Sequence, residues 1–242
     1  MKTKEFNARY FKKSFTASNQ ATYTGAGTDE FYTVTISNGN KKLLPNENVK
    51  YIIFNLLAVV TCPYRTAHCE QFCYAKKAET GPRAKSVVPC RSANYEASKT
   101  TGFVPAMISL IEDTIKKPSY KDGKKIVIRI HESGDFYSQE YFNKWLEIAN
   151  HFKNNNKLVF VAYTKSVDFI HDVPANMVIR FSIWDDTEPA AIEKANALNL
   201  PIYTAVETFT DEPKRMQCDC VNCSTCFKCY NAKFELLKCE IH

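Results

Sequence analysis

The chain has 242 residues, of which 45% are hydrophobic and 24% charged, with 10 cysteines and a formal net charge of +6. A chain of this length can bury a full core without covalent staples, and this composition excludes global disorder. The sequence has neither a run of about eighteen apolar residues nor a secretory leader, so we expect a cytoplasmic protein with no membrane partner. In a reducing cytoplasm, cysteines serve as metal ligands or reactive thiols more often than as disulfides.

The basic residues form scattered clusters at Lys12-Lys13, Lys41-Lys42, Lys76-Lys77 and from Lys116 to Lys125. Such a surplus can attract nucleic-acid phosphates through a salt-sensitive electrostatic attraction. The alternative is a solvated lysine-rich surface, which is favoured because the clusters are scattered and lack an arginine–aromatic module. A nucleic-acid partner is therefore one open hypothesis, beside a small-molecule or anionic substrate.

Residues 1–50 are predicted to form an N-terminal β appendage. They contain the segment TYTGAGTDEFYTVTISNGNKKLLPN, which predicts a β-hairpin whose Asn38-Gly39 turn accommodates positive φ. The next segment, Tyr51 to Val60, is a near-continuous apolar run and predicts a strand buried on both faces.

Residues 51–210 are predicted to form a β/α domain. Periodicity from Arg91 to Lys117 predicts two short helices, broken near Gly102 to Pro105. The later elements are expected as a strand at Lys125–His131, a helix at Ser138–Phe152, a strand at Leu158–Thr164, a helical turn at Val167–Ile170, a strand at Met177–Trp184, a helix at Pro189–Leu198 and a strand at Ile202–Glu207. Five strands separated by helices indicate parallel βαβ units. The fold class is therefore α/β, as a partial or complete (β/α) barrel or as an open sheet.

The first cysteine group lies directly after the first predicted strand. Cys62, Cys69 and Cys73 fall within a stretch of twelve residues. A loop of this length can wrap an iron–sulfur cluster, whose ligands are cysteine thiolates. Three thiolates leave one iron open for a substrate, a cofactor or a fourth cysteine, and structural zinc is the alternative metal.

Residues 211–242 are predicted to form a cysteine-rich metal-binding tail. The tail has almost no periodic apolar pattern, so something other than a hydrophobic core must organise it. Cys220, Cys223, Cys226 and Cys229 form an unbroken C-x2-C-x2-C-x2-C run. The first three match the spacing of bacterial ferredoxins, which predicts iron–sulfur ligands. Zinc is the alternative, because zinc sites also use C-x2-C pairs.

Polar residues follow the second and third predicted strands of the β/α domain. Ligands gather at the carboxyl ends of parallel strands, so we expect His131–Asp135 to face the first cysteine loop. Arg129 and His131 are two residues apart, which predicts that they share one face of their strand. Arg129, His131, Asp135 and Lys165 are therefore candidate catalytic or anion-binding residues. The alternatives are an internal Arg129–Asp135 ion pair, a hydrogen-bonded interior His131, an N-cap role for Asp135 and a solvent-facing Lys165.

The order of these features resembles the radical S-adenosylmethionine (SAM) enzymes. In both, a three-cysteine loop follows the first strand, and here it ends in Cys73-Tyr74-Ala75. In that family a Gly-Gly-Glu step after the second strand contacts the methionine part of SAM, and Ser133-Gly134-Asp135 stands at this place. The resemblance implies SAM as a cofactor, bound by Ser133, Gly134 and Asp135. The spacing C-x6-C-x3-C differs from the usual C-x3-C-x2-C of that family.

A closer resemblance is to the phage gene product 88-like family. The matching motifs are the CP-x-x-T-x-x-C-x-x-x-CYA loop at Cys62–Ala75 and the R-I-H-x-SGDF-Y segment at Arg129–Tyr137. A YTKS-like segment and a cysteine-rich tail also match, and the likeness covers roughly residues 50 to 230. It implies a phage-encoded protein with one or two [4Fe–4S] clusters on a barrel-like fold, in the cytoplasm of the infected bacterial cell.

Three functions stay open at this point. The first is an enzyme in which an open cluster iron faces a pocket and acts on a substrate or on SAM. The second is an electron-transfer or redox-sensing protein in which cysteine caps every iron, and the third is a nucleic-acid-associated protein with structural zinc sites. The convergence of cysteines and polar residues at one end of the strands favours the first, because a purely structural cluster does not need it.

Overall fold

The computed structural model describes residues 19–40, 43–121, 125–206, 217–218, 223–233 and 235–240. The strands are β1 (Gln20–Thr24), β2 (Phe31–Ser37), β3 (Val49–Phe54), β4 (Lys125–Ile130), β5 (Leu158–Thr164), β6 (Met177–Ile183), β7 (Ile202–Val206), β8 (Gln217–Cys218) and β9 (Leu236–Glu240). The helices are α1 (Ala67–Gln71), α2 (Tyr74–Thr80), α3 (Ala84–Lys99), α4 (Phe103–Ile115), α5 (Pro118–Lys121), α6 (Gln139–His151), α7 (Pro189–Ala197) and α8 (Cys223–Cys226), with 3-10 turns η2 (Val167–Phe169) and η4 (Lys228–Tyr230). None of these helices combines the length and the apolar character needed to cross a membrane.

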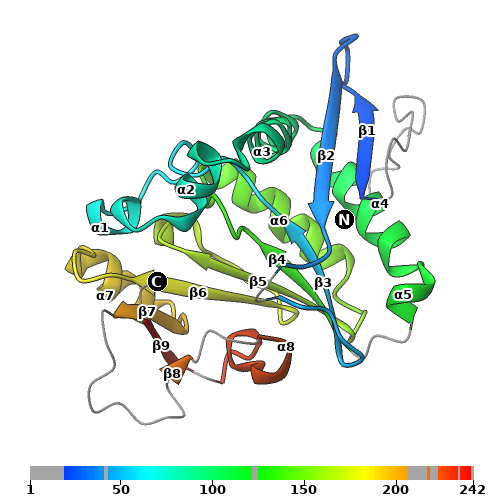
Figure 1. Cartoon of the computed structure of the whole chain (residues 1–242). Coiled ribbons are helices and arrows are strands. Elements are labelled where there is room, and N and C mark those ends of the chain that lie inside the picture. The colour runs from blue at the N-terminus through cyan, green and yellow to red at the C-terminus, as the bar shows by residue number, and fades with distance from the viewer. Residues whose placement is uncertain are drawn as a thin grey trace.

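The described strands form one mixed sheet in the order β1-β2-β3-β4-β5-β6-β7-β9-β8 (Figure 1). The pairs from β3 through β7 to β9 and β8 are parallel, whereas β1, β2 and β3 pair antiparallel. Within the described residues β1 and β8 are the two edges of the sheet, so the sheet is open. The complete (β/α) barrel expected from the sequence is not formed, and the open-sheet alternative describes the arrangement.

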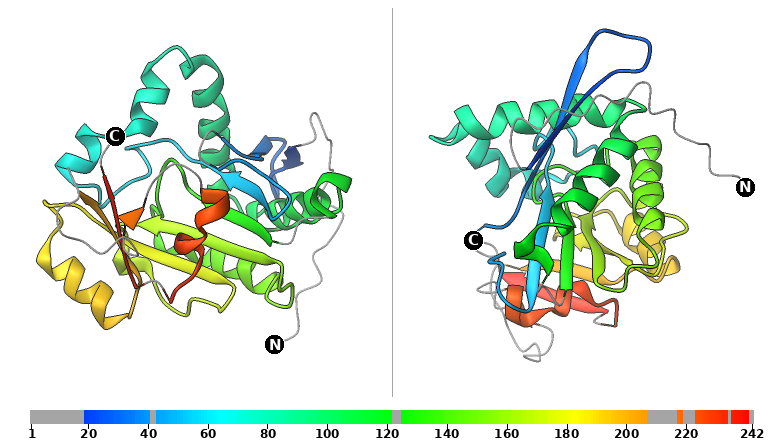
Figure 2. Two further views of the ribbon diagram at one scale, coloured as in Figure 1. Left: turned by 60° about the horizontal axis from the view of Figure 1, so that its bottom comes forward. Right: turned by 90° about the vertical axis from the view of Figure 1, so that its right-hand side faces the viewer.

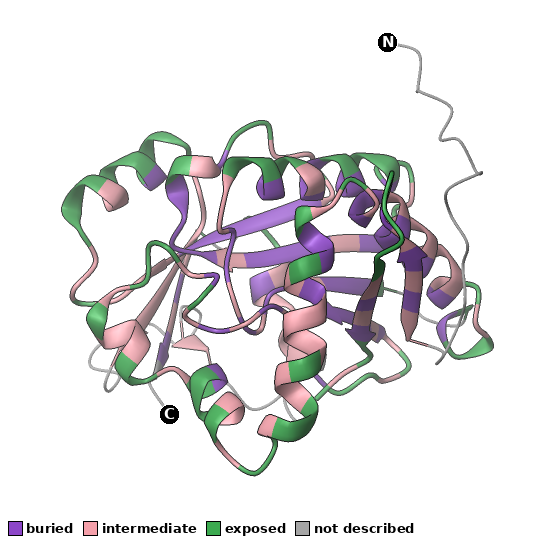
Figure 3. Ribbon diagram, turned by 90° about the horizontal axis from the view of Figure 1, so that it is seen from above, coloured by how far each residue is buried: buried purple, intermediate pink, exposed green. Residues whose placement is uncertain are grey.

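The central strands are buried on both faces, as their apolar sequences predict. On one face, isoleucines of β4 pack with α4 and α6 in a core that includes Phe54, Phe103 and Trp145. Figure 3 shows the central strands buried, while the helices that cover them expose their outer surfaces. On the other face, Tyr51 and Val127 belong to a smaller cluster, against which residues of the cysteine-rich tail pack.

The α8–η4 part of the tail and the long helices therefore lie on opposite faces of the sheet, whereas β8 and β9 of the tail extend the sheet itself. Helices α3, α4 and α6 cover one face, and α8 with η4 lies below the strands on the other (Figures 1 and 2). Phe227 and Tyr230 pack against the smaller cluster, and the Tyr230 hydroxyl donates to the Tyr51 hydroxyl at 3.1 Å. The tail thus covers the sheet face that the helices leave open.

The N-terminal hairpin exists, but its turn is not where the sequence placed it. Strands β1 and β2 pair through residues 20–24 and 31–35, and the turn between them includes Gly27 at φ 75°. The Asn38-Gly39 step follows β2 instead, so its assignment as the hairpin turn was wrong. Strand β2 continues into the main sheet by pairing with β3, and the Asn94 side chain of α3 bonds to both backbone groups of Thr35.

Most of the predicted elements of the β/α region are confirmed. Strand β5 has the predicted bounds, and α6 lies between Ser138, whose hydroxyl accepts from Tyr141 N at 3.2 Å, and Phe152 at its C-cap. The strand predicted over Tyr51–Val60 was too long, because β3 ends at Phe54. The sequence interpretation also missed α1, α2 and β9. The predicted domain boundaries at residues 50 and 210 stay a prediction.

Candidate functional site

The first cysteine group lies on the loop and short helices that follow β3. The chain turns at Val59, whose φ is 66°, and reaches α1, where Thr66 accepts a hydrogen bond from Cys69 N. Cys73 is the N-cap of α2, and its sulfur accepts from Lys76 N at 3.4 Å. Each of the two helix starts therefore holds one cysteine in a fixed position.

The thiols of Cys62, Cys69 and Cys73 are free and partly exposed. Burial raises the pKa of Cys62 to about 12, with further contributions from Asp135 and from the other two cysteines of the group. Burial likewise raises the pKa of Cys69 to about 11, against the lowering effect of Lys165. The charges of the three thiols therefore affect one another, although their sulfur atoms do not all lie within 4.8 Å of one another.

The segment after β4 packs directly against this loop. Ser133 Oγ donates to Leu56 O at 2.8 Å, Leu56 N donates to Ser133 O at 2.9 Å, and Asp135 N donates to Thr61 O at 3.2 Å. Gly134 has φ 88°, and a Cβ there would lie 2.5 Å from Thr61 Oγ1 and 2.7 Å from Leu56 Cβ. Only glycine fits both the left-handed backbone and this close approach. The two segments expected to face each other are therefore in contact.

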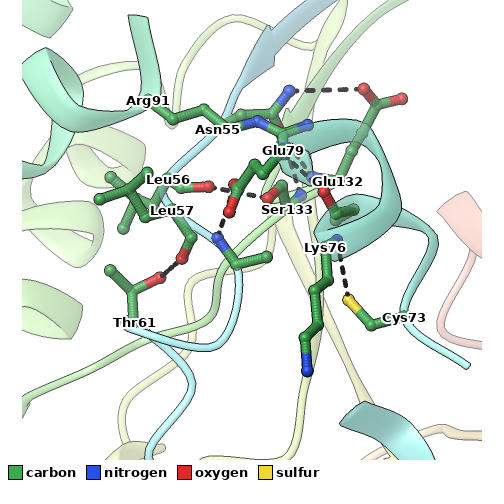
Figure 4. Close-up of polar contacts among 12 residues, drawn as sticks. Asn55, Leu56, Leu57, Thr61, Cys73, Lys76, Glu79, Arg91, Glu132 and Ser133 are labelled. Atoms are coloured by element: carbon green, nitrogen blue, oxygen red, sulfur yellow. Dashed lines mark hydrogen bonds and ion pairs between the residues drawn. The ribbon is translucent and has the colours of Figure 1, made fainter. Parts of the chain in front are cut away.

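A second set of polar contacts fixes the start of the cysteine loop (Figure 4). Glu79 of α2 accepts from Ala58 N at 2.8 Å and from Arg91 Nη1 at 2.8 Å. Asn55 accepts from the backbone N–H groups of Glu132 and Ser133 at 2.7 and 3.1 Å. These bonds join the ends of strands β3 and β4 to each other and helices α2 and α3 to the start of the loop. The start of the cysteine loop is therefore held by contacts with both.

Asp135 is buried and belongs to the ends of two strands at once. Its carboxylate accepts from Thr164 Oγ1 at 2.6 Å, from Lys165 N at 2.9 Å and from Phe136 N at 2.7 Å. Burial raises the pKa of Asp135 to about 6, although these donors favour the charged form. The alternatives of an Arg129–Asp135 ion pair and of an N-cap role do not describe these contacts, since Ser138 caps α6.

Lys165 is buried rather than solvent-facing. Its Nζ donates to Ser182 O at 2.9 Å and reaches Thr187 Oγ1 at 3.4 Å. Burial lowers the pKa of Lys165, while the negative charges of Cys69 and Asp135 raise it. The Lys165 amine is therefore held at the end of β5, near enough to Cys69 for their charges to affect each other.

Arg129 and His131 lie on opposite faces of the sheet, contrary to the sequence prediction. His131 has φ 64°, and its ring packs among aromatic residues that include Phe136, with Nε2 2.8 Å from Tyr141 Oη. Burial lowers the pKa of His131 to about 3, so the ring is neutral. This agrees with the alternative prediction that His131 is a hydrogen-bonded interior residue. The prediction of a shared face assumed that residues two apart in a strand point the same way, and the left-handed backbone of His131 breaks this alternation.

Arg129 faces the tail side of the sheet. Its guanidinium carbon lies 3.9 Å from the centre of the Tyr163 ring, in a cation–π contact. Its Nη1 atom is buried and has no hydrogen-bond partner among the described residues. The sequence predicted Arg129 as a catalytic or anion-binding residue on the same face as His131. In the structure it lies beside Tyr163 on the opposite face.

The tail cysteines form a second group on this face. Cys218, Cys223, Cys226 and Cys229 line one small cavity of about 10 Å³. A hydrogen bond with Cys218 is the largest cause that lowers the pKa of Cys229, and burial opposes it. Cys220, which the sequence interpretation included, lies outside the described residues. Cys239 of β9 is disulfide-bonded.

Arg180 of β6 holds the tail in place, and the sequence interpretation missed this role. Its Nε donates to Cys229 O at 3.0 Å, and its Nη2 donates to Lys228 O at 2.9 Å and to Asn231 O at 2.8 Å. The side chain is fully buried. A single arginine inside an apolar strand is the signal that could have identified it, because a buried guanidinium needs several acceptors.

A further group of polar side chains lies beside Cys69. His68, Asp185 and Asp186 offer ligand atoms that all lie within 4.8 Å of one another. Asp186 also accepts from His68 N at 2.8 Å. These contacts join α1 to the segment after β6. Asp185 and Asp186 follow the carboxyl end of a strand, and this position is the sequence feature that could have predicted them as site residues.

A family model described as "Gene product 88" matches residues 34–238 of the chain. The chain belongs to the phage gene product 88 family. It is 28% identical over 141 residues to the Gene 88 protein of Mycobacterium phage D29, a match that covers 57% of this chain and 56% of the relative's length. It is 25% identical over 199 residues to the Gene 88 protein of Mycobacterium phage L5, covering 73% of this chain and 81% of the relative.

The matched region includes the site described above except for Cys239. Both cysteine groups and the segment from Arg129 to Asp135 fall within residues 34–238. The expected membership of the phage gene product 88 family is therefore confirmed. The names of the family and of these relatives do not specify a reaction, so the activity has to be argued from the site.

Proposed function

We propose that this member of the phage gene product 88 family is an iron–sulfur protein whose first cysteine group binds a [4Fe–4S] cluster. Cys62, Cys69 and Cys73 are the proposed ligands. The observation that carries the proposal is that one twelve-residue loop at the carboxyl end of the parallel strands carries three free thiols whose charges affect one another. Thiolates are the ligands that iron–sulfur clusters require.

The residues around the three thiols fit such a group. Cys73 Sγ already accepts a backbone N–H, from Lys76, and hydrogen bonds of this kind stabilise the sulfurs of bound clusters. All three thiols are partly exposed, so the loop can be loaded from solvent. The donor set consists of soft sulfur ligands, which iron–sulfur clusters and zinc prefer over hard oxygen-binding cations.

Three thiolates bind three of the four irons, so a bound cluster offers one open iron to a small molecule. Lys165 would supply the positive charge for an anionic substrate, because it is held beside Cys69 at the end of β5. Asp135 would act as a positioning residue, since it ties the ends of β4 and β5 together. We therefore favour an enzyme that acts on a small anionic molecule.

Binding of SAM is less well supported than binding of a cluster. Ser133 Oγ and the Asp135 carboxylate are buried and bond to neighbouring loops, and the space beside Gly134 is filled by Thr61 and Leu56. In this arrangement the Ser133-Gly134-Asp135 step supports the cysteine loop. Its assignment to SAM binding stays a prediction, which the formation of 5′-deoxyadenosine by the reduced protein would test.

An electron-transfer role is the second candidate, and the exposed surface of the loop favours it. Val60, Tyr64, Phe72 and Tyr74 are among the exposed large hydrophobic side chains of the described chain. An apolar rim beside a redox centre is a surface on which a partner protein can dock. Reversible one-electron reduction that no small molecule alters would support this candidate over the enzyme.

The proposal is tested by purifying the full chain under strict anaerobiosis and measuring iron and acid-labile sulfide. We expect about four of each per chain at the first group, lost when Cys62, Cys69 or Cys73 is changed to alanine. Cys90→Ala is the matched control, because Cys90 is a free, partly exposed thiol of α3. Iron retained by the three single variants, or a protein without iron and sulfide, would contradict the proposal.

A further inference from the structure

The tail cysteines differ from the first group in their surroundings. The first group belongs to a partly exposed loop, whereas Cys229 is buried under the sheet and the other three cysteines line the same cavity. The cavity of about 10 Å³ has the size of a single water-sized sphere. One ion fits this space, and a cubane of eight iron and sulfur atoms does not.

The cysteine beside Cys229 in this structure is Cys218. Strand β8 pairs with β9, so that Cys218 lies opposite Cys239 in the sheet. Lys228 Nζ donates to Gln217 O at 3.0 Å, which holds β8 beside η4. Cys218 follows Gln217 and Cys229 follows Lys228 in the sequence, and both cysteines line the same cavity.

The resulting spacing is Cys218-x4-Cys223-x2-Cys226-x2-Cys229. Structural zinc sites use cysteine pairs separated by two to four residues and hold the ion with four sulfurs at about 2.3 Å. Phe227, at φ 54°, turns the chain between Cys226 and Cys229. The left-handed turn separates Cys229 from helix α8. No three of the four sulfurs lie within 4.8 Å of one another in this structure, so binding of the ion has to draw them together.

The charges around the cavity suit a tetrathiolate site. Zn²⁺ with four thiolates carries a net double negative charge, which neighbouring cations stabilise. The positive charges of Arg180 and Arg129 both act on Cys229. Arg129 Nη1 is buried without a hydrogen-bond partner among the described residues, as expected of a group that balances a nearby negative centre.

We propose that Cys218, Cys223, Cys226 and Cys229 bind one Zn²⁺ ion, which fixes the tail on the sheet face opposite the long helices. The site is separate from the cluster proposed for the first group. Only a few described tail residues, among them Phe227 and Tyr230, pack on the sheet. The metal supplies the stabilisation that so small a core lacks, as in other small metal-organised units.

The test is the zinc content of the full chain purified from zinc-containing medium. We expect about one zinc per chain, lost in Cys218→Ser and Cys226→Ser and kept in Cys90→Ser and Cys220→Ser. Cys226→His should keep the zinc, because histidine is also a zinc ligand. Zinc kept by Cys218→Ser but lost by Cys220→Ser would overturn the assignment, and so would iron and sulfide that disappear with Cys226→Ser.

Two further measurements separate this proposal from misfolding and from the first site. If the serine variants are insoluble, X-ray absorption at the zinc edge of the wild-type protein should show four sulfurs at about 2.3 Å, and nitrogen or oxygen ligands would contradict the proposal. The triple variant Cys62→Ala, Cys69→Ala, Cys73→Ala should lose iron and keep zinc. Loss of both metals together would show that the tail is not an independent site.

Discussion

Arg180 and Cys229, 49 residues apart in sequence, are joined by a 3.0 Å hydrogen bond from the guanidinium Nε to the backbone carbonyl. The same guanidinium also donates to the carbonyls of Lys228 and Asn231. One buried side chain of the central sheet thus satisfies three carbonyls of the tail. The tail is therefore docked on the sheet by polar contacts as well as by its aromatic residues.

We predict that Arg180→Ala releases the tail from the sheet. The change leaves buried carbonyls without donors, which should lower the free energy of unfolding by about 3 kcal/mol. Urea denaturation and the rate of tryptic cleavage in the tail measure the two effects. Lys194→Ala is the control, since Lys194 pairs with Asp168 on the exposed surface, and it should cost less than about 1 kcal/mol. Equal effects of the two variants would refute the docking role.

Gly134 gives a second prediction, with Gly27 as its matched control. Both residues have positive φ, but only at Gly134 would a Cβ meet neighbouring atoms closer than 3 Å. We expect Gly27→Ala to destabilise the protein by about 1 kcal/mol through backbone strain alone. Gly134→Ala should cost at least about 3 kcal/mol and weaken iron retention, because Thr61 and the cysteine loop must move. A Gly134→Ala variant as stable as Gly27→Ala would contradict this packing.

Much of the fold followed from local pattern, and the failures have physical causes. The bounds of β5 and α6 were readable because an apolar strand and a serine cap signal them directly. The direction of the His131 side chain was not predictable, since no sequence pattern signals its positive φ, which turns the ring into the aromatic core. The apolar residues after Phe54 look in sequence like a continuation of the strand. Their backbone N–H groups instead donate to loop and helix residues, Leu56 N to Ser133 O and Ala58 N to the Glu79 carboxylate.

In the candidate site too, the features that are local in sequence were predicted, and those that depend on long-range packing were not. Cysteine spacing identified the first group, because ligands on one loop are local in sequence. Cys218 was passed over in favour of Cys220, since only the long-range pairing of β8 with β9 brings it to the cavity. The contacts of Arg180 with the tail were not predicted, because its acceptors are backbone carbonyls, which no sequence motif reveals.

Glu79 should control how well the first loop is organised. Glu79→Ala removes the acceptor for Ala58 N and the partner of Arg91, both largely buried, which should cost about 2 kcal/mol. Glu79→Gln keeps a carbonyl acceptor for Ala58 and should recover about half of that loss. We expect the iron content after anaerobic reconstitution to follow the same order. Full iron loading of Glu79→Ala would show that the loop does not depend on this anchor.

His131 makes the stability of the protein depend on pH. Burial lowers its pKa from 6.5 to about 3, so in the folded protein the ring stays neutral while the unfolded chain takes up a proton below pH 6.5. Its contribution to stability is therefore complete above pH 6.5 and is lost progressively as the pH falls toward 3. Between pH 6.5 and 4.5 the loss should be about 2–3 kcal/mol.

The variant His131→Asn isolates this contribution, because asparagine tolerates left-handed φ but does not titrate. We expect it to be less stable than the wild type at pH 7, where it loses the contact with Tyr141, and to lose less stability on acidification. Urea unfolding at several pH values measures both slopes. Parallel slopes for wild type and His131→Asn would mean that folding does not lower the pKa of His131, and would contradict the prediction.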